Sequence, residues 1–333
     1  MYRISLRRNP VLPLLAAGTG LCALLLLSAC SKSETVADPV ELSLFPVAHA
    51  STKADPELDG TSLGTDHTYV IRLSASTPQQ PFYLTDQLFS YIDDGDHRWK
   101  ASSAPGTHTP VYWPGGGERV DLLACALTQA ACADLTLAWS AAPADGFTVS
   151  DWDTYACQYD VMYAACNNRT GGVVDLGFRH TMAVLAFTAE CTDAGVFTLD
   201  GITVDGLEYG GSLTVDNSRS GITSGWTTTA TGDKDVRKRD DASSTDLAFA
   251  VPAAAAQCAM HLLVPPQYVK DITIHYSLPG SDLSLDYTIR LPRTFWRAGY
   301  KYTYALRFTP TEVLADPSIT DWDGLAVELE EDI

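Results

Sequence analysis

Basic residues are scarce in this 333-residue chain. Lys and Arg total 22 against 41 Asp and Glu, which gives a formal net charge of −19. Arg3, Arg7 and Arg8 lie before position 30 in a stretch without acidic residues, so the charge becomes −22 once that stretch is removed. Such a body repels the phosphate backbone of nucleic acids and the anionic headgroups of lipids. The composition therefore excludes nucleic acid as a partner, and any membrane attachment must be covalent or hydrophobic.

The sequence also lacks the motifs that mark common catalytic sites. It contains no His-Glu-x-x-His, no Gly-x-Ser-x-Gly and no phosphate-binding glycine loop. The acidic segments 93–96 and 321–323 lack the ligand pattern of an EF-hand loop, which favours solvated turns over calcium sites. His180 and His275 lie within or beside apolar strands, as hydrogen-bonded core residues do. We therefore expect a protein that is not an enzyme and has no catalytic residue, metal or cofactor.

The one long apolar run lies at the N-terminus. It covers residues 11–29 and follows the three arginines, an order typical of a secretory signal. The run ends in Leu-Ser-Ala-Cys, which resembles the lipobox of bacterial lipoproteins. That resemblance implies cleavage between Ala29 and Cys30 and acylation of the Cys30 sulfur. An ordinary signal peptide or an N-terminal transmembrane anchor are the alternatives, and Pro13 and Gly18 disfavour the anchor. We expect a signal peptide over 1–29 and a polar leash over 30–39.

Cysteine usage leaves the redox state open. Cys22 lies in the signal and Cys30 would carry the lipid. Six thiols remain in the body, namely Cys125, Cys132, Cys157, Cys166, Cys191 and Cys258. An even number in an exported chain permits three disulfides in fifteen connectivities. Six buried thiols that act as small hydrophobic residues are equally compatible with the sequence. No Cys-x-x-Cys occurs, so a zinc ribbon or thioredoxin-type site has no support.

Alternation of apolar and polar residues with period two runs through the body. In segment 300–308 the residues Tyr300, Tyr302, Tyr304, Leu306 and Phe308 share one face, which predicts a half-buried strand. Segments 272–276 and 283–291 predict a hairpin. Further strands are indicated at 69–73, 120–125, 135–139, 173–178, 182–187, 195–199, 202–204, 211–215, 247–251 and 260–264, with turn signals at Asp200-Gly201, Asp205-Gly206 and Gly210-Gly211.

Many short strands without a sustained helical period predict an all-β chain of antiparallel sandwiches. One sandwich takes about 100 residues, so the length suits two in series. The polar, glycine-bearing segment 167–172 is the best boundary, which gives an N-terminal β-sandwich over 40–171 and a C-terminal one over 172–333. Segment 227–245 is polar and of mixed charge, and it predicts a long exposed loop in the second domain.

Several segments together resemble the fimbrillin-like family, whose members are subunits of type V pili and related surface lipoproteins. The resemblance lies in Trp99-Lys100, Tyr112-Trp-Pro-Gly, Val120-Asp-Leu-Leu-Ala-Cys125, Asp160-Val-Met-Tyr-Ala164, the segment 174–187, Leu263-Val-Pro-Pro-Gln267, the segment 296–304 and Ile319-Thr-Asp-Trp322. These matches follow the family order from about residue 40 to residue 325. The chain departs from the family pattern at Ala124-Cys125, where an aromatic residue is usual, and in its six cysteines.

The resemblance implies two transthyretin-like β-sandwich domains in series and assembly by donor-strand exchange. A trypsin-like protease removes the first strand of the lipidated precursor, and a strand of a neighbouring subunit fills the groove. In this chain the displaced strand would carry Leu42, Leu44, Phe45 and Val47. The cleavage usually follows an Arg, and the matching place here is Lys53 before Ala54.

At the C-terminus, Leu325, Val327 and Leu329 alternate with small or acidic residues and form a candidate donor strand. A frayed acidic tail is the alternative reading of that segment.

The resemblance thus predicts a non-enzymatic pilus subunit or cell-surface adhesin that mediates cell adhesion. Its partners would be other pilus subunits, of the same or another kind, and the outer membrane through the lipid on Cys30. It would bind a host or bacterial surface receptor that the sequence does not identify. The rival reading is a surface glycan-binding lipoprotein of a nutrient-uptake system. That rival requires two or three Trp or Tyr rings aligned on one exposed face.

Overall fold

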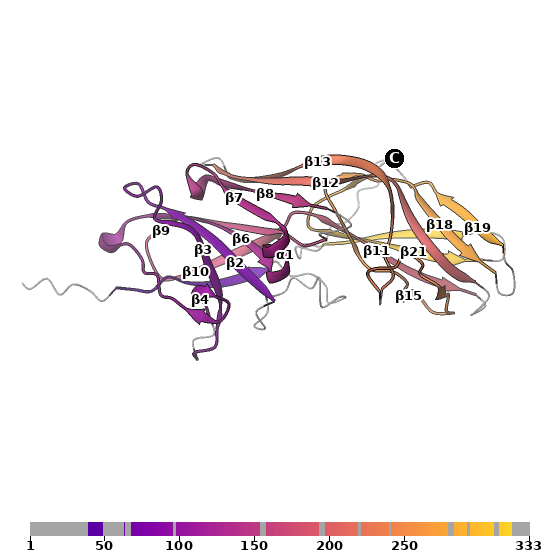
Figure 1. The fold of residues 1–333 in the computed structure, drawn as a ribbon, viewed down its shortest axis with the longest axis horizontal. Helices are drawn as coiled ribbons and strands as arrows, with labels where there is room; N and C mark the ends of the chain where they lie inside the picture. Colours follow the sequence, from indigo (N-terminus) through magenta and orange to yellow (C-terminus); the bar gives the residue numbers. More distant parts are fainter. Residues whose placement is uncertain are drawn as a thin grey trace, which may run out of the picture. The chain divides into compact units, whose positions relative to one another are not determined.

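Strands make up nearly all the regular structure of the chain. The computed structural model describes residues 39–48, 63, 68–95, 98–153, 158–192, 197–218, 221–239, 241–278, 283–291, 294–309 and 313–321. These residues belong to one unit, Pro39–Ile333. The predicted all-β class is confirmed, and the strands form β-sandwich-like sheets (Figure 1). Among the described residues, no helix has the length and apolar character needed to cross a membrane.

The first sheet closes on itself through its first strand. Its eight strands follow the order β1-β10-β9-β6-β2-β3-β4-β5, and β1 also pairs with β4. The strands from β1 to β4 in this order therefore form a ring, to which β5 is attached. Their bounds are β1 Ser43–Ala48, β2 Tyr69–Ser76, β3 Leu84–Ile92, β4 Arg98–Ala104, β5 Thr107–His108, β6 Val120–Thr128, β9 Met162–Arg169 and β10 Val173–His180. The ring encloses an apolar core that includes Ile71, Phe89, Trp99 and Phe178.

Two further sheets face each other across a second core. One has the order β15-β11-β21-β22 with β16 beside β11, and the other β19-β18-β12-β8-β7 with β13 and β14 beside β12. Phe187 on β11 and Tyr304 on β21 stack within this core, which Ile202 and Ile274 complete from the opposite sheet. The bounds are β7 Thr136–Trp139, β8 Gly146–Trp152, β11 Ala183–Cys191, β12 Thr198–Ser218, β13 Gly221–Asp235, β14 Phe249–Ala250, β15 Ala256–Gln257, β16 Leu262–Val264, β18 Ile272–Ser277, β19 Ser284–Ile289, β21 Tyr300–Phe308 and β22 Val313–Asp321.

The remaining elements are short. Strands β17 (Gln267–Tyr268) and β20 (Phe295–Trp296) form a two-stranded sheet. Helix α1 (Gln129–Asp134) begins after Thr128, whose side-chain oxygen accepts a hydrogen bond from the Ala131 amide at 3.1 Å, a standard N-cap. The 3₁₀ turns η1 (Gly115–Gly117) and η2 (Pro143–Asp145) complete the list.

Strand β6 is buried on both of its faces. Leu122, Ala124 and Ala126 point into the core of the closed sheet. Leu123, Cys125 and Leu127 instead join a third core with Val149 of β8 and Leu213 of β12. An uninterrupted apolar run, rather than an alternating one, is what burial on both faces requires. The sequence of β6, VDLLACALT, has that run.

Strand pairs cross the position where the sequence predicts a domain boundary. β10, which begins at Val173, pairs with β1 and β9 of the closed sheet. β12 pairs in turn with β8 through partners such as Val215 and Phe147. The division at residues 171 and 172 stays a prediction.

The turns predicted within residues 198–218 are wrong, because these residues form the single strand β12. The ladder shifts register between Leu199 and Gly201, between Val204 and Leu207, and between Gly211 and Leu213. Gly211 has φ +127°, and a Cβ there would lie 2.0 Å from the Thr227 carbonyl oxygen. The glycines therefore mark β-bulges and a close backbone approach, not chain reversals.

The loop predicted over residues 227–245 is wrong in its first part, because β13 continues to Asp235. Its residues alternate: Trp226, Thr228 and Ala230 are half-buried, whereas Thr227 and Thr229 are exposed. Trp226 packs on Trp152 with ring centroids 5.2 Å apart, and its Nε1 donates a hydrogen bond to the Thr181 carbonyl at 2.8 Å. Threonine suits a half-buried pleated surface, so a polar segment can form an outer strand.

Replacing Trp226 with alanine tests whether this ring holds β13 in place. We expect Trp226→Ala to lower the free energy of unfolding by about 2–4 kcal/mol, because it removes a large aromatic contact and a hydrogen bond. Urea denaturation followed by circular dichroism measures the change. The matched control is Thr227→Ala on the exposed face, which should stay within about 0.5 kcal/mol of the parent. Equal effects of the two substitutions would contradict the packing role of Trp226.

Candidate functional site: the seam of the first strand

Strand β1 is held on both of its edges. On one side it runs parallel to β10, from the pair Ser43 and Val173 to the pair Ala48 and Phe178. On the other side it runs antiparallel to β4, where Ser43 lies opposite Lys100 and Leu44 opposite Trp99. We call this arrangement, β1 between β4 and β10, the seam.

The chain just before β1 is also paired. The Leu42 amide donates to the Val111 carbonyl at 2.9 Å, and the Trp113 amide donates to the Val40 carbonyl at 2.9 Å. Glu41 forms a β-bridge with Tyr112 between these two bonds. Residues 40–44 are therefore bonded as part of a central strand, although they begin the described chain.

The side chains of the seam alternate between core and exterior. Leu42 and Leu44 are fully buried, with 0% of their surface exposed, and they belong to the core of the closed sheet. Phe45 lies opposite Asp175 and is 52% exposed. Two buried leucines contribute about 1.5–3 kcal/mol each relative to exposure. The candidate strand predicted from sequence thus lies in the sheet with Leu42 and Leu44 inward and Phe45 outward.

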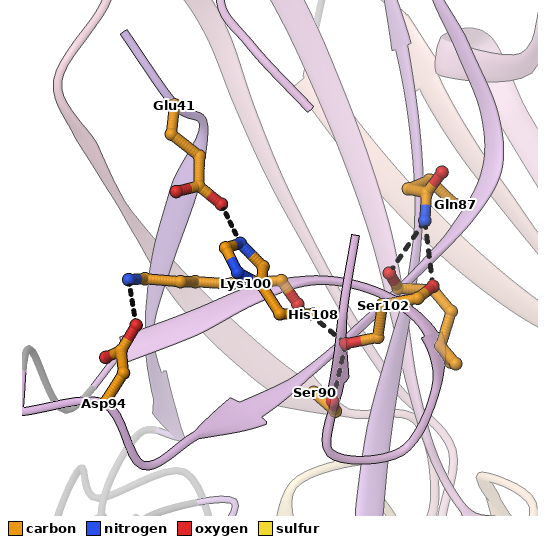
Figure 2. Close-up of polar contacts among 8 residues, drawn as sticks. Glu41, Gln87, Ser90, Asp94, Lys100, Ser102 and His108 are labelled. Atoms are coloured by element: carbon orange, nitrogen blue, oxygen red, sulfur yellow. Dashed lines mark hydrogen bonds and ion pairs between the residues drawn. The ribbon is translucent and has the colours of Figure 1, made fainter. Parts of the chain in front are cut away.

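A polar cluster covers the outer side of the seam. Figure 2 shows Nε2 of His108 against the Glu41 carboxylate, and Nζ of Lys100 against the Asp94 carboxylate. Lys100 is only 7% exposed and Ser43 only 6%, although both face away from the apolar core. The two contacts therefore link different elements to this outer side: the first joins β5 to the residues just before β1, and the second joins the β3–β4 connection to β4.

Serine and glutamine side chains hold the neighbouring strands β3 and β4 together. The hydroxyls of Ser90 and Ser102 lie 2.7 Å apart, and Gln87 Nε2 donates to the Ser102 carbonyl at 3.1 Å. The Gly106 amide donates to the Ser90 hydroxyl at 3.0 Å, which fixes the turn before β5 and thus the position of His108. The sequence contains no local signal for this cluster, because its contacts depend on how β3, β4 and β5 pair.

Most of the other sequence-predicted site residues fall outside the described chain. These are Ala29, Cys30, Lys53, Ala54, Leu325, Val327 and Leu329. Val47 belongs to β1 by its backbone, and its side chain is likewise outside the description.

His180 is hydrogen-bonded to a buried carboxylate in the closed sheet. Its Nδ1 lies 2.8 Å from Oδ2 of Asp160, and both side chains are almost completely buried. The neighbouring Thr181 hydroxyl donates to the Val161 carbonyl at 2.7 Å. The prediction that His180 is a hydrogen-bonded core residue is confirmed. His275 is also hydrogen-bonded, with Nδ1 2.8 Å from Oδ1 of Asp286, but it is half-buried.

None of the five described cysteines of the body forms a disulfide. Cys125, Cys191 and Cys258 are buried, and Cys132 and Cys166 are half-buried. Burial raises the pKa of the Cys125 thiol well above its usual value and that of Cys258 to about 12. These two thiols therefore stay protonated at neutral pH and act as small apolar residues, one of the two readings the sequence leaves open. Cys157 lies outside the described residues.

Two exposed aromatic residues bear on the glycan-binding alternative. Tyr268 is 66% exposed and Phe295 40%, and they lie opposite each other in the ribbon of β17 and β20. Their rings meet edge to face, with an interplanar angle of 89°. This pair does not offer the aligned ring faces that stacking on a sugar requires. Within the described ranges, no group of three or more His, Cys, Asp or Glu residues is arranged to hold a metal ion.

Comparison with solved structures shows where this fold occurs. A candidate cell adhesion protein from Bacteroides ovatus ATCC 8483 has a TM-score of 0.54 at 14% identity, covering 85% of this chain and 97% of the other. One from Bacteroides uniformis ATCC 8492 has a TM-score of 0.52 at 14% identity, covering 85% and 99%. A fimbrial protein from Bacteroides vulgatus ATCC 8482 has a TM-score of 0.50 at 13% identity, covering 84% and 99%.

Comparison with curated proteins found no match. A model of the fimbrillin-like family, in contrast, matches residues 59–322, which is most of the chain. The match includes most of the segments that surround the seam, among them Trp99-Lys100, Tyr112-Trp113 and the start of β10. The chain therefore belongs to the fimbrillin-like family.

Proposed function

We propose that this protein is a lipid-anchored pilus subunit or cell-surface adhesin that assembles by exchange of its first strand. The observation that carries the proposal is the seam: β1 is paired on both edges, and Leu42 and Leu44 fill the core beneath it. Loss of β1 would leave β4 and β10 with unpaired backbone groups and would open the core between them. A strand from another subunit with the same alternation restores both, which is β-augmentation.

The covalent connection makes β1 separable from the rest of the sheet. β1 ends at Ala48 and β2 begins at Tyr69, and Lys53 lies in the connection between them. A cut after Lys53 leaves β1 attached to the body by non-covalent contacts alone. Because Cys30 precedes β1, the same cut separates the lipid from the body. In this proposal one cleavage releases the subunit from the outer membrane and opens the place of its first strand.

The proposed donor is an extended segment of a neighbouring subunit. In this chain Leu325, Val327 and Leu329 form the candidate donor strand, and the acidic residues after them keep it soluble until it pairs. The lipid on Cys30 attaches the precursor to the outer membrane, and the assembled protein contacts a receptor on a host or bacterial surface.

Substitution of Cys30 tests the lipid anchor. Cys30→Ser should move the protein from the membrane fraction to the soluble fraction, because serine cannot carry the thioether-linked lipid. Cell fractionation and intact mass measure this. Cys22→Ser, within the proposed signal, is the matched control and should leave fractionation unchanged. Membrane association of the Cys30→Ser protein equal to that of the parent would exclude the anchor.

Substitution of Lys53 tests the maturation cleavage. Lys53→Ala should leave a surface protein that begins at acylated Cys30 and forms no fibres, because a trypsin-like protease needs a basic residue before the cut. N-terminal sequencing, intact mass and electron microscopy measure the outcome. Lys53→Arg is the control and should yield a chain beginning at Ala54. Normal fibres from the Lys53→Ala protein would rule out Lys53 as the processing site.

A further inference from the structure

The outer side of the seam selects which strand can occupy it. We infer that the place of β1 accepts a strand of another subunit whose consecutive side chains are acidic, large apolar, small and large apolar, at the positions of residues 41–44. The selecting residues are His108 and Lys100. The inference rests on the proposed function, that a foreign strand takes the place of β1, and it adds which strand that is.

The two apolar positions set affinity without much selection. Leu42 and Leu44 are 0% exposed and pack in the core with residues such as Trp99, Val174 and Leu176. Any strand with leucine-like side chains at this spacing fills the same space, because apolar burial is non-directional. Selection among such strands must come from the two positions that face outward.

The acidic position is defined by His108. Nε2 of His108 lies against the Glu41 carboxylate, and the side chains are 36% and 25% exposed. Asp94, the other carboxylate of this cluster, is paired with Lys100, so it does not take the place of Glu41 at His108. β5 and the turn before it are fixed by the Gly106 bond to Ser90, so His108 stays in place when β1 leaves. An incoming acidic residue restores the pair, whereas a neutral one leaves the ring without its carboxylate.

The small position is defined by Lys100. Ser43 lies directly opposite Lys100 in the antiparallel pair of β1 and β4, and both side chains are buried. Residues directly opposite each other have Cβ atoms about 4.5–5.5 Å apart. A larger side chain at position 43 would therefore have to displace the Lys100 side chain. The displacement would break the ion pair between the Lys100 ammonium and Asp94.

The C-terminal segment of this chain does not meet the full requirement. If Leu325 and Val327 take the inward positions, Ala326 fits the small position but Gly324 stands where the acid is needed. If Val327 and Leu329 take the inward positions, Glu328 stands at the small position, where a large side chain does not fit. The candidate donor strand at the C-terminus of a second copy therefore does not fit, and the inferred partner is a strand of a different subunit.

Strand exchange on the folded chain tests the inference. Residues 54–60 are replaced by the recognition site of a sequence-specific protease, and the full exported protein is cut after it has folded. Fluorescent peptides with the sequence of residues 39–48 then compete for the place of β1. We expect Glu41→Gln in the peptide to weaken binding about two- to five-fold, the range of an exposed ion pair. We expect Ser43→Leu to weaken it at least about tenfold, the cost of overpacking. The peptide of residues 323–332 should bind more weakly than the parent peptide.

Substitutions in the protein separate selection from simple loss of structure. In the His108→Ala protein, the parent peptide and the Glu41→Gln peptide should bind with equal affinity, because the residue that distinguishes them is gone. The control His275→Ala removes another outward-facing histidine–carboxylate pair, with Asp286, and should leave that difference intact. The inference would be overturned if the parent, Glu41→Gln and Ser43→Leu peptides bound with equal affinity. It would also be overturned if the 323–332 peptide bound as tightly as the parent peptide. In either case the proposed function would still stand. Failure of even the parent peptide to exchange would overturn the proposed function itself.

Discussion

Pairing of β1 with both β4 and β10 is the constraint on which the first half of the structure depends. A sheet that ended at β4 and β10 would have two unpaired edges and a core open between them. β1 removes both edges at once, and it does so with six residues from the very start of the described chain. Because β1 is joined to the rest of the sheet only through the connection to β2, the element that closes the sheet is also the element least secured by the chain itself. Closure of the sheet and burial of Leu42 and Leu44 in its core therefore both depend on this one strand.

On the opposite side of the closed sheet, the strand is packed on both of its faces. β6 lies between β2 and β9, and it is buried on both faces, because the third core packs on its outer side. That core joins β6 to β8 and β12, and Trp226 of β13 covers its Trp152. This side of the sheet is fixed by three elements that come from distant parts of the chain. Loss of β1 leaves β6 packed on both of its faces. Such packing favours local opening at the seam over unfolding of the whole sheet.

The sequence predicted those strands well in which large apolar and polar residues alternate strictly. Strands β18, β19 and β21 lie where strict alternation predicted them, because period two is a direct consequence of one-sided burial. Prediction failed at β12, since glycines that signal turns also occur in bulges, and only the partner strand decides between them. It failed at β13 because a threonine-rich segment has the polarity of a loop and is held by one tryptophan. In the seam, the family resemblance identified Leu42 and Leu44. His108, Asp94, Ser90 and Ser102 belong to no motif, and their contacts follow only from the pairing of β3, β4 and β5.

Inner and outer sides of the seam have different physical roles. The inner side is apolar, and the free energy that it provides depends on buried area and hardly on which apolar residue provides it. The outer side holds a lysine that is only 7% exposed and a hydrogen-bonded pair of histidine and glutamate, and such polar groups are costly to bury or crowd without their partners. A strand whose inward side chains fit the core but whose outward side chains do not match the polar groups gains the free energy of apolar burial. It then loses part of that free energy because buried polar groups are left without partners. Discrimination between partners that are all apolar on one face therefore has to come from the outer face. Several segments that carry the family resemblance, Trp99-Lys100 and Tyr112-Trp113 among them, border β1. The segments that carry the resemblance therefore pair with the first strand and its approach, whereas the strand itself, Ser43–Ala48, precedes the residues that the family model matches.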